Sequence, residues 1–246
     1  MIVPIEEPFR QFFEGLRPIL EEIEKNKANI EKFFQAFSDV TKYSVAIHKL
    51  GDAQFVVWSY MKNDFRDKII ESDNVNKTLR EFNIANKYRM VKDTIERSQK
   101  NHILKKYLRL YYQSVEAFWK GWYDISVLGF VSVIDGLMSD ISKDSTTKLS
   151  RRLNIIMKKI DKEEVLEDDE YATMSLAITF EKTMRIFSCN SDFRKKEPKG
   201  INRHWIAHGR SSRRKTKLDC VKMINLIYGL ILIHNLDCKC NNESEN

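Results

Sequence analysis

The distribution of proline and glycine is the feature that most constrains the fold of this 246-residue chain. The four prolines stand at positions 4, 8, 18 and 198, so none interrupts residues 19–197, and no glycine lies between Gly51 and Gly121. An all-β sandwich or barrel needs a turn about every 8–12 residues, and these turns are usually built with the same two residue types. The sequence therefore predicts an all-α protein.

The composition and the cysteines favour a folded protein of the cytoplasm. Hydrophobic residues make up 42% of the chain and charged residues 31%, which excludes a disordered chain. The four cysteines (189, 220, 238 and 240) contain no C-x-x-C pair and are typical of reduced thiols. The N-terminal MIVPIEEPFR lacks the basic region of a signal peptide. The apolar run 221–236 is shorter than the ~20 residues of a membrane span, so we expect a buried helix and no membrane partner.

Apolar spacing divides the chain into two predicted domains and a tail. Residues 1–99 are predicted to form an N-terminal helical extension of unknown role, with one of its helices over residues 53–62. Residues 100–240 carry the strongest apolar patterns and are predicted to form a helical bundle. Residues 241–246 are predicted to be a disordered tail, and the acidic run 161–170 is predicted to be a solvated loop.

One segment combines residue types that suit catalysis. It follows the helix-breaking sequence Glu-Pro-Lys-Gly at 197–200 and ends at Gly209, a natural helix C-cap, so it is predicted to be a short helix. Arg203, His204 and His208 lie within it. Histidine transfers protons near neutral pH, and arginine binds phosphate oxygens with a planar fork. These groups predict metal-free cleavage of RNA, in which the ribose 2′-OH attacks the phosphorus and the cation stabilises the developing charge.

Helix geometry adds a requirement for a second copy. At 100° per residue, His204 and His208 lie roughly 40° apart on one face, whereas Arg203 and His208 lie roughly 140° apart. Two copies facing across a two-fold axis would supply two of each group, so a homodimer is predicted. The site also requires that its groups be available. An Arg203 guanidinium locked in an internal ion pair, or a His208 imidazole shut off from every groove in every assembly, would overturn the nuclease interpretation and leave a helical bundle of unknown function.

The neighbouring residues suit an anionic partner such as RNA. Residues 201–217 carry six Lys and Arg residues and no acid, within a chain of net charge +7. Such a cluster attracts phosphates in a salt-dependent way, and an aromatic ring can stack on a base. The predicted substrate-binding residues are Asn202, Trp205, Arg210, Arg213, Arg214 and Lys215.

The string Asn-Arg-His-Trp-Ile-Ala-His-Gly at 202–209 resembles the Arg-polar-x3-His signature of the HEPN superfamily, and residues 114–137 are similar to its paired core helices. The resemblance implies an all-α bundle that dimerises and cleaves RNA without metal or other cofactor, leaving a 2′,3′-cyclic phosphate. It implies a toxin–antitoxin or phage-defence role, with an antitoxin or regulatory partner. It makes Arg203 and His208 catalytic and His204 an orienting residue, with Glu116 or Asp135 as a supporting acid.

Other interpretations of the same residues stay open. Some members of that superfamily have lost catalysis and only bind RNA, so a non-catalytic RNA-binding or interaction module is the alternative function. His204 and His208 share a helix face and are also compatible with half a zinc site, with Cys220 nearby in sequence, although no H-E-x-x-H motif is present. Both histidines are also compatible with an ordinary structural role. Walker A and glycine-rich dinucleotide motifs are absent.

Overall fold

The computed structural model describes residues 27–59, 61–85, 87–146, 148–160, 170–189 and 192–243. Within these ranges the chain forms helices and no strand, which confirms the predicted all-α class. The elements are α2 (Lys27–Asp52), α3 (Asn63–Glu71), α4 (Val75–Ala85), α5 (Arg89–Gln99), η1 (His102–Tyr107), α6 (Leu108–Trp119), α7 (Tyr123–Ser142), α8 (Leu149–Ile160), α9 (Glu170–Ser188), α10 (Arg203–Ala207) and α11 (Lys217–Glu243).

The division of the chain differs from the predicted one. The structure separates residues 1–44 from a compact unit of residues 45–246, whereas the sequence placed the boundary at 99/100. Both α4 and α5 pack against α11, so residues 45–99 belong with the bundle. Their polar composition conceals this because each of these helices buries only a narrow apolar stripe. Residues 241–243, predicted to lie in the tail, continue α11. Residues 1–26, 161–169 and 244–246 lie outside the described residues.

The helix predicted over residues 53–62 is wrong. Gln54 has a φ of 57°, and helix resumes only with α3 at Asn63. Phe55 and the two valines that follow it are all buried. In a helix with one face toward solvent, at least one of three consecutive residues would be exposed. The Val57 amide donates to Thr179 Oγ1 of α9 at 3.0 Å instead of to a helical carbonyl. Tertiary packing therefore overrides the local helical pattern.

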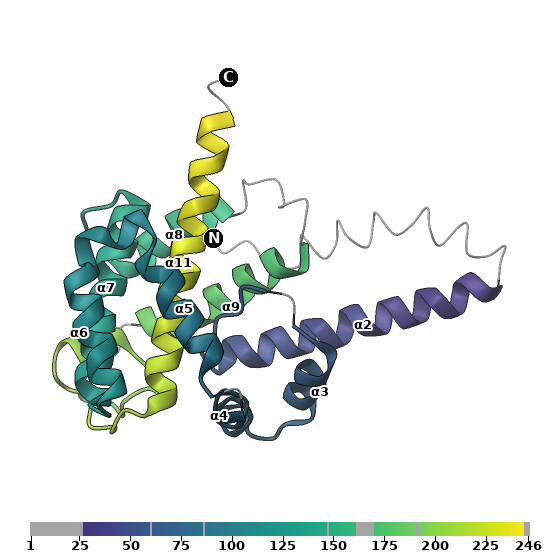
Figure 1. Ribbon diagram of the computed structural model, residues 1–246, viewed down its shortest axis with the longest axis horizontal. Helices are drawn as coiled ribbons and strands as arrows, with labels where there is room; N and C mark the ends of the chain where they lie inside the picture. The colour runs from purple at the N-terminus through teal and green to yellow at the C-terminus, as the bar shows by residue number, and fades with distance from the viewer. Residues whose placement is uncertain are drawn as a thin grey trace. The chain divides into compact units, whose positions relative to one another are not determined.

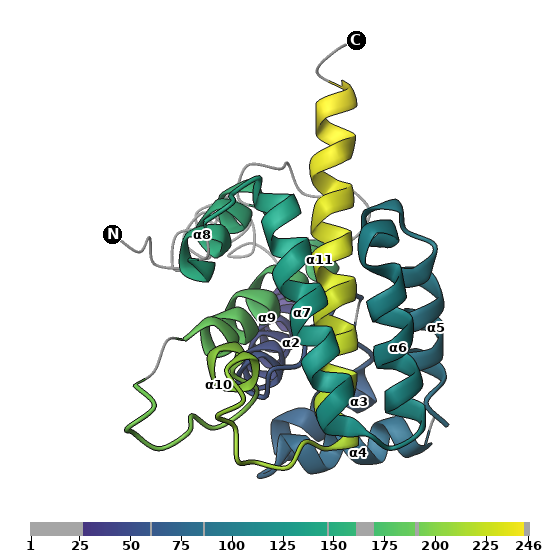
Figure 2. The ribbon, with the colours of Figure 1, turned by 90° about the vertical axis from the view of Figure 1, so that its left-hand side faces the viewer.

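Helices α7 and α11 form the centre of the unit that begins at residue 45. They pack against each other, with α6 and η1 against α7 and α5 against α11 (Figure 1). The short helix α10 packs against α7 and α9, and Figure 2 shows it beside these two helices. Side chains such as Phe130, Ile134 and Leu230 are fully buried between the layers. The predicted apolar helices over 125–141 and 221–236 are thus confirmed as core helices.

Two helices of the described chain are long and apolar enough to cross a membrane by length and composition alone. They are Tyr123–Ser142 and Lys217–Asn235. More than half of the first and most of the second are buried within the bundle. Core helices commonly pass this test, so the result is weak support for membrane insertion.

Two glycines of α7 allow its neighbours to approach closely. A Cβ at Gly129 would lie 2.0 Å from Ser114 Oγ of α6, and a Cβ at Gly136 would lie 2.3 Å from the Tyr107 ring of η1. The two glycines are seven residues apart and therefore share one face of the helix. The Tyr107 hydroxyl passes Gly136 and donates to Asp140 Oδ2 at 2.8 Å. Small residues on this face thus fix how closely η1 and α6 pack.

Gly136→Ala is predicted to destabilise the protein. The new methyl group displaces the Tyr107 ring and disturbs its bond to Asp140, which outweighs the better helix propensity of alanine; we expect a net loss of about 1–2 kcal/mol. Chemical denaturation measures this loss. The control is Gln113→Ala on the exposed side of α6, expected to change stability by no more than about 0.5 kcal/mol. Equal denaturation midpoints for the two variants would contradict the packing described here.

Candidate functional site

The short helix α10 carries Arg203 and His204 and is held in place by the side chain before it. Asn202 is the N-cap: its Oδ1 accepts a hydrogen bond from the Trp205 amide at 3.2 Å. Its Nδ2 donates to the carbonyls of Ile186 at 3.1 Å and Cys189 at 2.8 Å, at the C-terminal end of α9. One amide side chain therefore joins the start of α10 to the end of α9. At the other end Gly209 has a φ of +63°, as predicted for a helix C-cap.

The chain entering α10 is fixed by a second amide side chain. Gln54 Nε2 donates to the Ile201 carbonyl at 2.9 Å, and the Ile201 amide donates to Gln54 Oε1 at 2.6 Å. Gly200, with a φ of +92°, lies against this pair, and a Cβ there would be 2.1 Å from Gln54 Oε1. Gln54 thus holds the amide and carbonyl of Ile201, and Asn202 holds the Trp205 amide, so side-chain bonds fix the N-terminal end of α10.

A cluster of two imidazoles, one phenyl ring and one guanidinium lies at the surface beside α10. We call it the Phe193 cluster, and it consists of Phe193, His204, His208 and Arg210. The His204 ring stacks on the Phe193 ring, with centroids 4.4 Å apart and planes within 6°. His208 meets His204 edge to face at 4.7 Å and Phe193 at 5.6 Å. The Arg210 guanidinium carbon lies 5.3 Å from the centroid of the phenyl ring.

The two histidines of the cluster have different environments. His208 follows the last residue of α10 and is exposed, whereas His204 is half-buried. Partial burial, together with the nearby His208 and Arg203, lowers the pKa of His204 below its usual value. His204 is therefore mainly neutral at pH 7, which favours it as a hydrogen-bond acceptor or a base. The edge-to-face contact of the two rings agrees with the prediction that His204 and His208 lie on one side of a short helix.

Arg203, at the start of α10, forms an ion pair with Asp135 of α7. Its Nε and Nη2 lie 2.8 and 2.7 Å from the same carboxylate oxygen, Oδ2. The other oxygen, Oδ1, is buried and has no hydrogen-bond partner among the residues that the structure describes. Each of the two side chains is 24% exposed, so the pair lies at the edge of solvent. Asp135, named from the sequence as a supporting acid, is therefore in direct contact with the predicted catalytic arginine.

This ion pair is the arrangement that the sequence analysis set against a nuclease. Only one edge of the Arg203 guanidinium is used, since both bonds run from Nε and Nη2 to a single oxygen. No hydrogen bond from Nη1 to another part of the described chain is present. The pair thus neutralises most of the Arg203 charge and fixes the plane of its guanidinium, while one N–H edge remains for another acceptor.

Half of the six cations in residues 201–217 are engaged with carboxylates. Besides Arg203, Arg213 Nη1 lies 3.0 Å from Asp219 Oδ2, and Lys215 Nζ lies 3.7 Å from Glu197 Oε1. Lys215 is only 4% exposed, and burial followed by the charge of Arg213 lowers its pKa. The predicted phosphate-binding role of Lys215 is wrong for this conformation, because its ammonium group is buried and also bonds Ser211 Oγ and the Arg213 carbonyl.

The loop that follows α10 is organised by the same two acids. Glu197 Oε2 accepts hydrogen bonds from the amides of Ser212 and Arg213. Burial raises the pKa of Glu197, but these two bonds and the bond from the Ser211 hydroxyl lower it by more, so its pKa lies below the usual value. Asp219 accepts bonds from Thr216 as well as Arg213, and Thr216 Oγ1 accepts from the Asp219 amide. The predicted capping of α11 by Thr216 and Asp219 is confirmed. Arg213 thus has a structural role, contrary to the predicted RNA contact.

Three further predicted site residues lie elsewhere than expected. Asn202 is 1% exposed and all its bonds are internal, so it cannot contact RNA. The Trp205 side chain of α10 is 7% exposed, so it is buried in the bundle and cannot stack on a base. Glu116 on α6 pairs with Lys120, four residues further on, at 2.6 Å. Arg210 and Arg214 are exposed, as a phosphate-binding role requires.

Phe193 is the residue that the sequence analysis missed. It lies in a polar stretch between α9 and α10 and organises both imidazoles and Arg210 around its ring. A single aromatic residue within the run Ser-Asp-Phe-Arg-Lys-Lys at 191–196 was the available signal. A contact over eleven or more residues across a loop has no periodicity, so the spacing rules for helices and strands do not detect it.

The described residues contain no group of three or more His, Cys, Asp or Glu side chains suited to a metal ion. Cys220, considered above as a third ligand for the two histidines, is buried, with Sγ 3.8 Å from the Tyr123 carbonyl, and burial raises its pKa to about 12. A thiol with so high a pKa is a poor metal ligand at neutral pH, which argues against the zinc interpretation.

Asn202→Ala is predicted to destabilise the protein by about 2–3 kcal/mol, because it removes an N-cap and leaves two carbonyls of α9 without their donor. Urea denaturation gives the loss, and amide hydrogen exchange at Trp205 reports on the start of α10. Arg210→Ala, at an exposed position seven residues after the N-cap, is the control and is expected to lie within about 0.5 kcal/mol of the wild type. Unchanged exchange at Trp205 in N202A would show that the cap does not hold α10.

Comparison of the chain with family models, with curated proteins and with solved structures found no match. The functional interpretation of this site therefore depends on its own residues and on the resemblance of residues 202–209 to the HEPN signature.

Proposed function

We propose that the protein is a metal-independent endoribonuclease of HEPN-like fold, which cleaves RNA by attack of the ribose 2′-OH. The observation that carries the proposal is the Phe193 cluster, which holds two imidazoles 4.7 Å apart at the surface next to an exposed arginine. A proton donor and a proton acceptor at one phosphodiester are what this reaction needs, because RNA supplies its own nucleophile. The resemblance places such an enzyme in a toxin or phage-defence role.

Each group of the site has a defined task in this mechanism. In the two-copy site, His208 of one chain removes the proton from the 2′-OH as its oxygen bonds to phosphorus, and His208 of the second chain donates a proton to the 5′-oxygen as the old P–O bond breaks. His204, whose lowered pKa keeps it neutral, accepts a hydrogen bond and orients the site. Arg210 lies against the same phenyl ring and with Arg214 attracts the phosphate backbone. The product is a 2′,3′-cyclic phosphate.

Arg203 stabilises the charge at phosphorus through the edge that Asp135 does not occupy. Asp135 binds Nε and Nη2 and so fixes the plane of the guanidinium at the surface. A guanidinium fixed in advance needs no reorganisation when negative charge develops on a phosphate oxygen. Asp135 is then a positioning residue.

A second candidate function is a non-catalytic RNA-binding or interaction module, and the same ion pair favours it. A guanidinium neutralised by a carboxylate stabilises a developing negative charge less well than one without such a partner. In this function Arg203 and Asp135 join α10 to α7, and within residues 201–217 the cations without a carboxylate partner in the described chain, Arg210, Arg214 and Lys217, attract phosphate. The two functions differ in whether RNA is cleaved.

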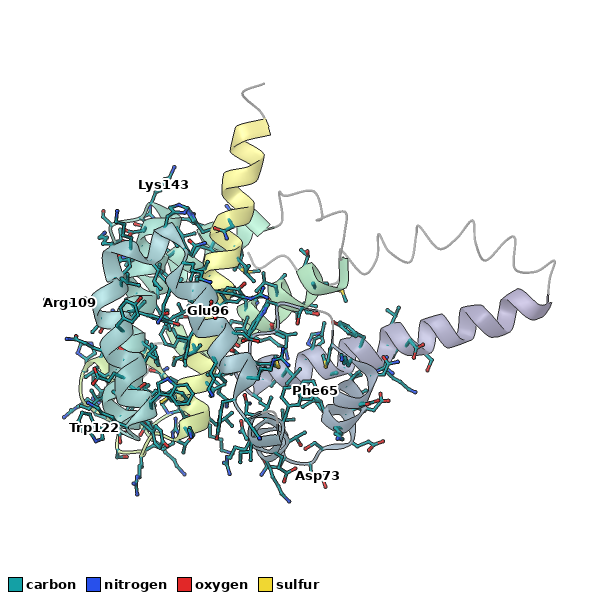
Figure 3. The ribbon with its side chains drawn as sticks, in the orientation of Figure 1. Phe65, Asp73, Glu96, Arg109, Trp122 and Lys143 are labelled. Carbon is teal, nitrogen blue, oxygen red and sulfur yellow. The ribbon has the colours of Figure 1, made fainter. Side chains whose placement is uncertain are left out.

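Dimerisation of the nuclease through α7 would bring two sites together. On this helix Ile125 is 62% exposed and Leu128 43%, and Trp122, just before it, is 57% exposed. Figure 3 labels Trp122 and Lys143, which lie next to the two ends of α7. Leu128 and Asp135 are seven residues apart and lie within roughly 20° of each other around the helix. An apolar surface that continues into the Arg203–Asp135 pair suits a two-fold interface that includes the site.

Incubation of RNA with the purified protein in EDTA tests the nuclease. The wild type is expected to cleave, and His208→Ala to reduce the rate about 10²–10⁴-fold because an acid or base is lost. Arg203→Ala is expected to cost about 10²–10³-fold. His48→Gln on α2 is the control and should cleave as the wild type does. Salt-dependent RNA binding by all four proteins without any cleavage would support the module instead, and EDTA-sensitive cleavage would indicate a metal enzyme.

Leu128→Asp is predicted to disrupt the dimer and with it the cleavage of RNA. A carboxylate at the centre of an apolar interface cannot be desolvated without a partner. Sedimentation velocity is expected to show a dimer for the wild type and a monomer for L128D. Gln113→Asp, on the exposed side of α6, adds the same charge elsewhere and should remain dimeric. A wild-type protein that sediments as a monomer at micromolar concentration would refute the two-copy site.

A further inference from the structure

Two histidines far apart in the sequence meet between η1 and α11, away from α10. His102 begins η1 and is exposed, and His234 lies on α11 and is half-buried. Their Nε2 atoms are 3.4 Å apart, with ring centroids at 5.4 Å and planes at 54°. Neither residue takes part in the function proposed above.

The backbones that carry this pair are joined by the neighbouring residues. Asn101 Nδ2 donates to Asn235 Oδ1 at 3.1 Å, so the residue before His102 is bonded to the residue after His234. Asn101 Oδ1 accepts a hydrogen bond from the Ile103 amide at 3.2 Å and thereby caps η1. One asparagine thus fixes the start of η1 and ties it to α11, which limits the relative movement of the two imidazoles.

The separation of the two nitrogens matches the geometry of a metal chelate. Zinc binds imidazole nitrogens at about 2.0–2.1 Å, and a tetrahedral angle then places two such nitrogens roughly 3.3–3.4 Å apart. Without an ion, the same contact is within the limit of a hydrogen bond in which one Nε2–H donates to the other Nε2. We propose that His102 and His234 form a binding site for a divalent transition-metal ion of the zinc class.

The site has two ligands from this part of the chain and leaves the other positions to water or to an external ligand. No third His, Cys, Asp or Glu side chain completes it among the described residues. It is therefore an open, two-imidazole site, distinct from a closed structural zinc site with four protein ligands. The bound ion links η1 to the C-terminal half of α11 and stabilises the folded state by an amount that grows with the logarithm of its concentration above the Kd.

Equilibrium dialysis of the full-length protein against ZnCl2 tests the proposal. The experiment uses the double variant His204→Ala/His208→Ala as the background, so that the other histidine pair does not contribute. Adding His102→Ala or His234→Gln is expected to remove one zinc equivalent, or to weaken its binding at least tenfold. The cysteines are present in every protein compared, and their contribution cancels.

Circular dichroism without zinc checks that the added substitutions leave the fold intact. Two results would overturn the proposal: equal zinc binding in the background and in both added variants, or a loss in H234Q that H102A does not share. In the second case His234 would bind zinc with other ligands. Neither result bears on RNA cleavage, which is measured in EDTA with the native histidines 102 and 234.

Discussion

The packing of α7 against α11 is the constraint on which the rest of the structure depends. Both helices are apolar on most of their circumference, so neither can face water on its own. Once they are paired, α6 and η1 cover one side of α7, and α10 approaches another side, where Asp135 meets Arg203. The candidate site is therefore attached to the central helix pair of this unit, although its own helix has only five residues.

A five-residue helix is not stable on its own, and its position comes from side chains that bind its backbone. Asn202 and Gln54 supply these bonds from within the bundle, and Gly200 and Gly209 permit the turns on either side. The Arg203–Asp135 pair then fixes one side chain of the helix, and Phe193 fixes another. The site is consequently rigid where it joins the core and open where His208 and Arg210 face solvent.

The sequence predicted the helical class, the two central helices and the short helix before Gly209, because each depends on local periodicity or on a residue with a fixed backbone preference. It failed at residues 53–62, where buried neighbours replace helical hydrogen bonds, and at the domain boundary, because α4 and α5 show little apolar surface. For the site, it identified the two imidazoles and named Asp135. It assigned Asn202, Trp205, Arg213 and Lys215 to RNA because charge and aromaticity do not reveal burial. Phe193 was missed because its contacts cross a loop.

The internal pairing of Arg203, Arg213 and Lys215 changes the electrostatics of any encounter with a polyanion. Each phosphate neutralised on a single strand contributes about −0.7 to the slope of log K against log salt concentration through counterion release. Six available cations would give a slope near −4, whereas the three that lack a carboxylate partner in the described chain, Arg210, Arg214 and Lys217, give a slope near −2. In the proposed function, one copy of residues 201–217 therefore supplies about half of the salt dependence that its composition suggests, and a two-fold pair of chains would supply the rest.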